Sequence, residues 1–267
     1  MLGTLKHRLK SFLRPAVEQH AQEDTSVDAN LSGWFDQEGG ALFKGFTVGP
    51  QDSVLDIGCG DGTFIRFCAQ LGAEVLFADV DGAKIADVER SLQSSVARGV
   101  QGLVTDANPL PLPDARVSKI VAMEVLEHVE DPAQFMRELV RVGQPGAQYL
   151  ITVPDVLGET VQKDLAPAAY FERPNHIRIF QRDEFERLVA DAGLIIEERA
   201  YYGFFWSVWW FFFWACKQEL GDPWHPLLRS WGQTWNQLLA MPDGPRIKAA
   251  MDKAMPKSQL ILARKPI

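Results

Sequence analysis

Short apolar runs alternate with amphipathic segments over most of the chain. Seven runs have the length and apolar character of buried strands, and they lie at residues 54–57, 75–78, 102–104, 120–123, 149–153, 194–200 and 259–263. Segments with apolar residues at helical spacing separate several of these runs, at residues 63–71, 85–96, 132–140 and 185–192. This alternation predicts an α/β fold with a parallel, doubly wound, Rossmann-like sheet of seven strands that is covered on both faces.

The hydrophobic pattern also predicts how the chain is divided. About 55 residues separate the sixth expected strand from the seventh, far more than an ordinary connection, so we expect a helical insertion at about 203–257 within a domain spanning 41–267. Residues 1–40 are expected to form an amphipathic helix and a polar lid segment. Within them, residues 1–14 combine apolar positions at helical spacing with four Lys and Arg residues and no acid, a pattern typical of helices that lie on a membrane surface. A first helix packed on its own domain is the alternative.

The segment 201–216 is uncharged and strongly aromatic. Eleven aromatic residues lie between Tyr201 and Trp214, and seven of the eight tryptophans lie beyond residue 205. The run is shorter than the ~20 residues of a spanning helix, and tryptophan favours the membrane interface. Three interpretations remain open: a segment that inserts into a membrane surface, an aromatic lid or pocket for a hydrophobic substrate, and a buried contact in a homodimer.

Composition narrows the class of protein. The 267 residues include 27 basic and 35 acidic side chains, a net charge of −8, which argues against a nucleic-acid partner because neutralising phosphates needs a basic surface. The three cysteines show no Cys-x-x-Cys spacing, which favours a reducing compartment. No secretory signal is evident at the N-terminus. We therefore expect a cytoplasmic protein, peripheral to the inner face of a membrane.

A glycine-rich loop is the first motif that points to chemistry. The sequence Asp-Ile-Gly-Cys-Gly-Asp-Gly at 56–62 follows one expected strand and precedes a helix, where glycines allow the backbone to approach a ligand closely. A dinucleotide fingerprint needs a glycine at the sixth position, which here is Thr63. Asp79 ends the second strand, where a carboxylate can accept hydrogen bonds from both hydroxyls of a ribose. Asp106, after the third strand, can accept one from an adenine amino group.

Two further motifs follow, Glu124-Val125-Leu126-Glu127-His128 and His176-Ile177-Arg178-Ile179-Phe180. Together with the glycine loop and the two aspartates, they make residues 50–200 resemble the class I S-adenosylmethionine-dependent methyltransferases. Within that family they are most similar to the ubiquinone-biosynthetic O-methyltransferases. The resemblance implies an enzyme that uses S-adenosyl-L-methionine. It departs from the family at Lys119, where an aspartate is common, which puts the local packing in question. The residues implied in cofactor binding are Asp56, Gly58, Cys59, Gly60, Asp79, Val80, Asp106, Ala107 and Glu124.

Two residues after the fourth strand are the candidate catalytic groups. His128 is the candidate general base because its unperturbed pKa is near neutrality, the alternative being a histidine that only orients the loop. Glu124 can offset the positive charges of the cofactor. The spacing of Glu124, Glu127 and His128 would also allow a shared helix face that binds a divalent metal, and the sequence leaves this open. His176 is interpreted as a turn histidine, with a place in the acceptor pocket as the alternative.

These observations predict methyl transfer to a small, lipophilic or membrane-associated acceptor, with oxygen as the methylated atom. The alternatives are C- or N-methylation of a soluble metabolite and a methyltransferase-like binding protein without turnover.

Overall fold

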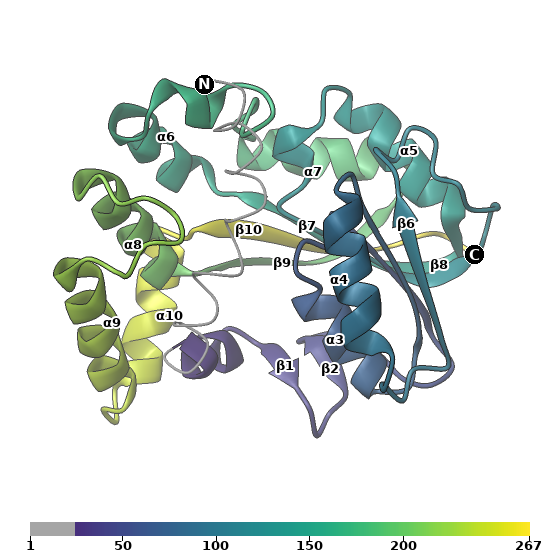
Figure 1. Ribbon diagram of the computed structural model, residues 1–267, viewed down its shortest axis with the longest axis horizontal. Helices are drawn as coiled ribbons and strands as arrows, with labels where there is room; N and C mark the ends of the chain where they lie inside the picture. Colours follow the sequence, from purple (N-terminus) through teal and green to yellow (C-terminus); the bar gives the residue numbers. More distant parts are fainter. Residues whose placement is uncertain (1–24) are drawn as a thin grey trace. The chain divides into compact units, whose positions relative to one another are not determined.

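The computed structural model describes residues 25–267, which divide into two compact units (Figure 1). The first, here called the sheet unit, contains residues 35–153, 181–200 and 260–267. The second, the helical unit, contains residues 25–34, 154–180 and 201–259. The amphipathic helix predicted at 1–14 lies outside the described residues.

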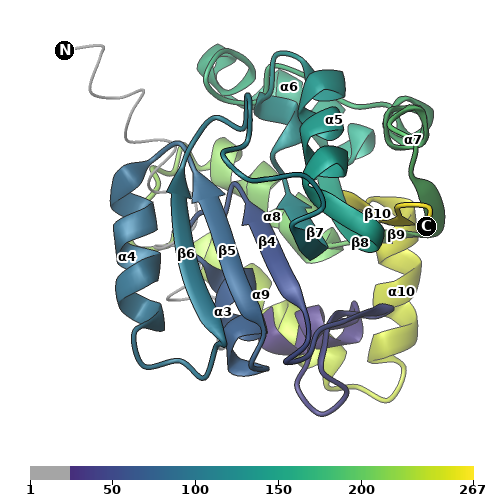
Figure 2. The same cartoon turned by 90° about the vertical axis from the view of Figure 1, so that its right-hand side faces the viewer.

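A seven-stranded sheet forms the centre of the sheet unit. Its spatial order is β6-β5-β4-β7-β8-β10-β9, and Figure 2 shows β6, β5 and β4 side by side. The pairs β5–β6, β4–β5, β4–β7 and β7–β8 are parallel. The strands are β4 (Ser53–Ile57), β5 (Glu74–Asp79), β6 (Gly99–Val104), β7 (Val117–Met123), β8 (Gly143–Pro154), β9 (Ile195–Tyr202) and β10 (Ser258–Arg264). All seven predicted strands are confirmed.

The central strands are rich in apolar residues because they are covered on both faces. All five residues of β4 are buried, as are the four middle residues of β5. The helices of this unit are α3 (Thr63–Gln70), α4 (Gly82–Leu92), α5 (Pro132–Val142) and α7 (Arg182–Asp191). Helix α4 ends before the predicted boundary at 96, and Val96 is 71% exposed.

The polar lid segment expected before residue 40 contains regular secondary structure in its described part. Residues 25–31 are helical, and β1 (Trp34–Asp36), β2 (Ala41–Phe43) and β3 (Phe46–Thr47) form a small separate sheet. Trp34 is 5% exposed, so its ring belongs to a hydrophobic core. Short strands between glycine turns leave too few alternating positions for the pattern to indicate them.

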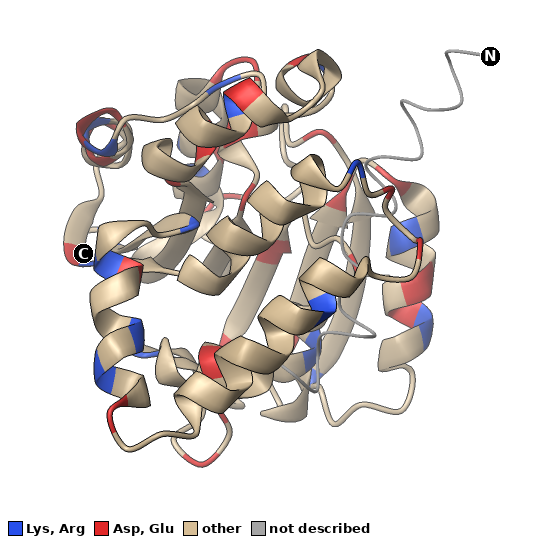
Figure 3. Cartoon of the chain, turned by 90° about the vertical axis from the view of Figure 1, so that its left-hand side faces the viewer, with Lys and Arg blue, Asp and Glu red and all other residues tan. Residues whose placement is uncertain are grey.

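The helical unit contains the aromatic segment. Its elements are α6 (Val156–Leu165), the short 3-10 helix η2 (Ala168–Phe171), α8 (Phe204–Ala215), α9 (Pro226–Leu239) and α10 (Gly244–Ala254). Helix α8 carries no charged side chain and α9 carries only Arg229, so both are almost free of charge along their length (Figure 3). Among the described residues, none of the helices is long and apolar enough to cross a membrane.

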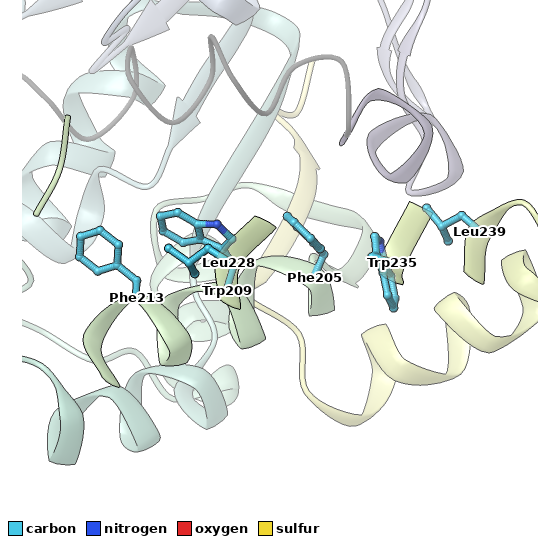
Figure 4. Packing of buried hydrophobic residues seen from close by; sticks show 6 residues of the cluster. All are labelled: Phe205, Trp209, Phe213, Leu228, Trp235 and Leu239. Atoms are coloured by element: carbon cyan, nitrogen blue, oxygen red, sulfur yellow. The ribbon is translucent and has the colours of Figure 1, made fainter. Parts of the chain in front are cut away.

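The rings of α8 form a core of their own with α9. Residues from both helices lie side by side in this core (Figure 4), and the buried members are Phe205, Trp209, Phe213, Leu228, Trp235 and Leu239. Phe205 stacks on Trp231, with 5.8 Å between the ring centres. Many aromatic residues of the segment 201–216 therefore pack the core of the insertion itself.

A buried ion cluster fastens this core to the rest of the helical unit. Lys248 of α10 is 1% exposed, donates to the Asp252 carboxylate and to Ser32 Oγ at 2.7 Å, and lies 3.5 Å from Asp28. Asp252 also accepts the backbone N–H of Phe204 at 2.9 Å, and Asp28 accepts the indole N–H of Trp235 at 2.8 Å. The cluster thus joins residues 25–34 to the start of α8, to α9 and to α10.

Candidate active site

The glycine loop connects β4 to α3 in a conformation that requires its glycines. Gly58, Gly60 and Gly62 have φ values of 68°, 57° and 82°, a region that side chains disfavour. A Cβ atom on Gly58 would lie 2.5 Å from the Val125 side chain. Cys59 is fully buried and donates its N–H to Ala78 of β5 at 3.0 Å. The loop therefore has a backbone without side chains at its three glycines, and the hydrogen bond from Cys59 fixes it to β5.

Asp79 lies at the carboxyl end of β5 and holds the glycine loop directly. One of its carboxylate oxygens accepts the N–H of Gly60 at 3.2 Å, and the other accepts the N–H of Asp81 at 3.0 Å. A carboxylate offers about four lone-pair sites, so acceptor capacity remains for two further donors. The arrangement suits a vicinal diol and fits the cofactor that the sequence predicts.

The segment after β6 approaches the same strand ends. Thr105 donates its N–H to the Asp79 carbonyl at 3.1 Å, which ties the two loops together. Ala107 follows with a φ of 63° and is 2% exposed. One oxygen of Asp106 accepts the N–H of Asn108 at 3.1 Å. Asp79, Asp106 and the glycine loop thus meet at one edge of the sheet, as the sequence predicts.

The other residues implied in cofactor binding differ from one another in burial and in hydrogen bonding. Asp56 is 1% exposed within β4, directly before the glycine loop. Val80 is 54% exposed beside Asp79. Glu124, at the end of β7, has a φ of 53°, and its carboxylate accepts the Thr152 hydroxyl at 3.0 Å. Its N–H donates to the Thr152 carbonyl at 3.1 Å, so β8 fixes this residue in a conformation that costs energy.

Glu124, Glu127 and His128 do not share an α-helical face. Glu124 has a positive φ, and only Leu126–His128 form a single 3-10 turn, so the predicted spacing of i, i+3 and i+4 on one helix is absent. Glu127 is 1% exposed. The His128 side chain is 21% exposed, and its Nε2 lies 3.7 Å from Glu127 Oε1. His128 is therefore a partly accessible imidazole beside a buried carboxylate.

Lys119, which departs from the family pattern, has a defined environment. Its ammonium group donates to Gln148 Oε1 and lies 5.1 Å from the centre of the Phe46 ring. Burial lowers the pKa of this lysine. An amide acceptor and an aromatic face therefore take the place of the local packing that an aspartate would require.

The helical unit contains a buried polar chain that the sequence did not indicate. His176 is 8% exposed and its Nδ1 lies 2.8 Å from Glu159 Oε2. Its Nε2 lies 3.4 Å from the Tyr170 hydroxyl, and Gln162 donates to the other oxygen of Glu159 at 3.1 Å. Trp214 of α8 donates to Gln162 at 3.0 Å. His176 is thus a loop residue, as predicted, but its side chain belongs to a network that no motif spacing could reveal.

Comparisons with known proteins agree with this geometry. A family model described as a methyltransferase domain matches residues 5–198. A Mycobacterium tuberculosis protein named as a probable S-adenosylmethionine-dependent methyltransferase is 32% identical over 188 residues, which cover 69% of this chain and 64% of that protein. The chain therefore spans just under two thirds of that relative.

A ubiquinone biosynthesis O-methyltransferase of Pseudomonas paraeruginosa is 27% identical over 175 residues, covering 62% of this chain and 70% of that enzyme. Among solved structures, a geranyl diphosphate methyltransferase in complex with GPP and sinefungin matches with a TM-score of 0.57. It is 18% identical and the match covers 89% of this chain and 78% of that one, a likeness of fold.

Proposed function

The chain belongs to the class I S-adenosylmethionine-dependent methyltransferases, and on this premise we propose that it methylates an oxygen of a small lipophilic acceptor. The observation that carries the proposal is the convergence of the bare glycine loop, Asp79 and Asp106 at the carboxyl edge of the sheet. Ligands of open α/β sheets bind at this edge.

The cofactor is assigned to residues of the sheet unit. We assign the methionine part to the backbone of Gly58, Cys59 and Gly60, where both glycines have positive φ values, with Asp56 directly before the loop in β4. Asp79 would hold the ribose hydroxyls with Val80 beside it, and Asp106 with Ala107 would contact the adenine. Bound S-adenosylmethionine supplies a methyl group on a positively charged sulfur, and the carboxylate of Glu124 lies on the same edge to offset that charge.

His128 is proposed as the general base. Methyl transfer to a hydroxyl oxygen forms a carbon–oxygen bond and releases the hydroxyl proton, which a neutral imidazole can take. The side chain of His128 is 21% exposed and follows the strand that carries Glu124. A metal at Glu124, Glu127 and His128 has less support because these residues lack the shared helix face.

A lipophilic acceptor is supported by the helical unit and by the relatives. Several rings of α8 and α9 remain only partly buried around the core, among them Trp206, Trp210, Phe212 and Trp231. The name of one relative includes ubiquinone biosynthesis. A prenylated phenol or a similar lipid combines a hydroxyl group with an apolar body.

The proposed function is tested by mass spectrometry of lipid extracts incubated with the protein and methyl-labelled cofactor. We expect label in an ether of a lipid-soluble product, and His128→Gln to lower turnover about a hundredfold or more while the affinity for S-adenosylhomocysteine is unchanged. The loss should shrink at alkaline pH, where the acceptor hydroxyl ionises without a base. His225→Gln, an exposed histidine of the helical unit, is the matched control.

Three outcomes would contradict parts of this proposal. Label on nitrogen or carbon of a water-soluble product would favour the alternative methyltransferase. Cofactor binding without any labelled product from lipid or aqueous extracts would indicate a binding protein. Full activity of His128→Gln at neutral pH would exclude its role as base.

We further propose that the protein contacts a membrane surface from the cytoplasmic side, through residues 1–14 and 201–216 and with the help of α6. Helix α6 is inverted with respect to an ordinary surface helix: Glu159 and Gln162 are buried, whereas Leu157, Val161 and Leu165 are 45%, 41% and 44% exposed. These leucines and the valine recur every four residues and form one stripe. Helices α6 and α8 pack together through the opposite, buried face of α6, where Trp214 donates to Gln162.

The membrane proposal predicts flotation with vesicles of phosphatidylcholine and phosphatidylglycerol. Two changes are each expected to reduce the bound fraction severalfold, because two weak anchors act together: deletion of residues 1–14, and the triple variant Leu157→Ser, Val161→Ser, Leu165→Ser. Val96→Ser, which removes an exposed apolar residue from the sheet unit, should float like the parent. If the parent stays in the aqueous fraction, the aromatic segment is a lid, a pocket or a dimer contact instead.

A further inference from the structure

The loop that follows Asp106 and Ala107 contains no helix, and it needs an external support. Residues 105–116 connect β6 to β7 as turns and irregular backbone. Ala107 keeps a positive φ, which persists in a non-glycine residue only when the surrounding structure holds it. The side chains of Leu110 and Leu112 are 2% and 7% exposed, so the loop is anchored by apolar burial. Apolar burial fixes a loop loosely, whereas nucleobase recognition needs a defined backbone.

Arg141 of α5 fixes the backbone of this loop through hydrogen bonds. Its guanidinium group donates to the Leu112 carbonyl at 2.8 Å and to the Leu110 carbonyl at 2.9 Å. It also donates to Asp114 at 2.8 Å and, through two nitrogens, to both oxygens of Glu138 at 3.0 and 2.8 Å. All five N–H donors of the side chain are thus used.

Glu138, one turn earlier on α5, binds the same loop. It is 8% exposed, and its Oε2 accepts the N–H of Leu110 at 2.9 Å. Both backbone polar groups of Leu110 are therefore bound by this pair of side chains, three residues after Ala107. The hydrogen bonds from Arg141 lower the pKa of Glu138, so the carboxylate stays ionised at neutral pH.

We propose that Glu138 and Arg141 are positioning residues for nucleobase selectivity, holding Asp106 and Ala107 where they distinguish adenine from hypoxanthine. This inference rests on the proposed cofactor site. The adenine amino group donates to a carboxylate, whereas hypoxanthine presents an oxygen at the same place, which repels it. One oxygen of Asp106 is already engaged by Asn108, so the direction of the other depends on how the loop is held.

The test compares binding of S-adenosylhomocysteine with binding of S-inosylhomocysteine by calorimetry. The parent should prefer the adenine compound at least tenfold. In Arg141→Met and Glu138→Gln, affinity for the adenine compound should fall about tenfold while affinity for the inosine compound changes less than threefold, so that selectivity is lost. Arg137→Met, on the same helix, removes a guanidinium group that donates to Gln134 and should retain the parent's selectivity.

The outcomes separate this inference from the proposed function. Equal losses for both compounds, or no loss for either, would overturn the selectivity role, because a merely structural clamp does not distinguish the bases. A parent that binds neither compound would overturn the proposed cofactor site instead. If Arg141→Met fails to fold, Arg141→Lys keeps the charge but has fewer donors, and it should show the same collapse of the ratio.

Discussion

Asp79→Ala should reduce the affinity for S-adenosylhomocysteine by at least a hundredfold. The substitution removes the proposed acceptor of the ribose hydroxyls and the acceptor that holds the Gly60 N–H in the glycine loop. Hydrogen bonds to charged groups contribute roughly 1.5–3 kcal/mol each, so losing two costs about 3 kcal/mol or more, which corresponds to about two orders of magnitude in affinity. Isothermal titration calorimetry measures the change directly and needs no knowledge of the methyl acceptor.

Two further variants make this result specific. Asp79→Asn keeps one oxygen acceptor and should lose less affinity than Asp79→Ala. Asp87→Ala removes an exposed carboxylate from α4 of the same unit, where it pairs with Arg90, and should bind like the parent. Binding by Asp79→Ala within threefold of the parent would place the ribose elsewhere.

The central sheet was predictable because its physics is local. A parallel strand covered on both faces is a nearly continuous apolar run, and an amphipathic helix that follows it shows the 3.6-residue period. The glycine loop was predictable for a related reason, since a ligand-binding turn at φ values near 60° favours glycine over residues with a side chain. Asp79 and Asp106 could be placed at one edge because parallel strands end together.

Helix α6 shows why other elements could not be predicted. Its buried positions include Glu159 and Gln162, and its exposed stripe is Leu157, Val161 and Leu165, so the hydrophobic pattern indicates the wrong face. The polar side chains are stabilised inside by His176 and Trp214, which are distant in the sequence. A helix whose interior is a hydrogen-bonded network cannot be recognised before its partners are known.

The candidate catalytic residues show the same limit on a smaller scale. Spacing alone allowed Glu124, Glu127 and His128 to share a helix face. The backbone turns instead at Glu124, where Thr152 of the neighbouring strand binds both the N–H and the carboxylate. That contact joins residues 28 positions apart, so the local spacing of the motif gives no indication of it.

Lys248→Met should destabilise the protein by about 3–5 kcal/mol, because it leaves two buried carboxylates without their counter-charge. Lys248 is 1% exposed, and Asp28 and Asp252 are 4% and 6% exposed. Burial already raises the pKa of Asp28 against the opposing effect of Lys248. Without the lysine, Asp28 is expected to be neutralised more readily, so the loss should be smaller at pH 4 than at pH 7. Chemical denaturation of parent and variant at the two pH values measures it.

Lys253→Met on the same helix is the matched control, since this exposed lysine should change stability by no more than about 0.5 kcal/mol. Asp252 also accepts the first N–H of α8, so the lysine variant should loosen the aromatic helix and float poorly with vesicles. Its affinity for S-adenosylhomocysteine should nevertheless match the parent's, because the proposed cofactor residues all belong to the sheet unit. A variant that lost cofactor binding and vesicle binding together would show that the two units are energetically coupled. A loss below about 1 kcal/mol in the free energy of unfolding would mean that the buried ion cluster orients its helices without stabilising the protein.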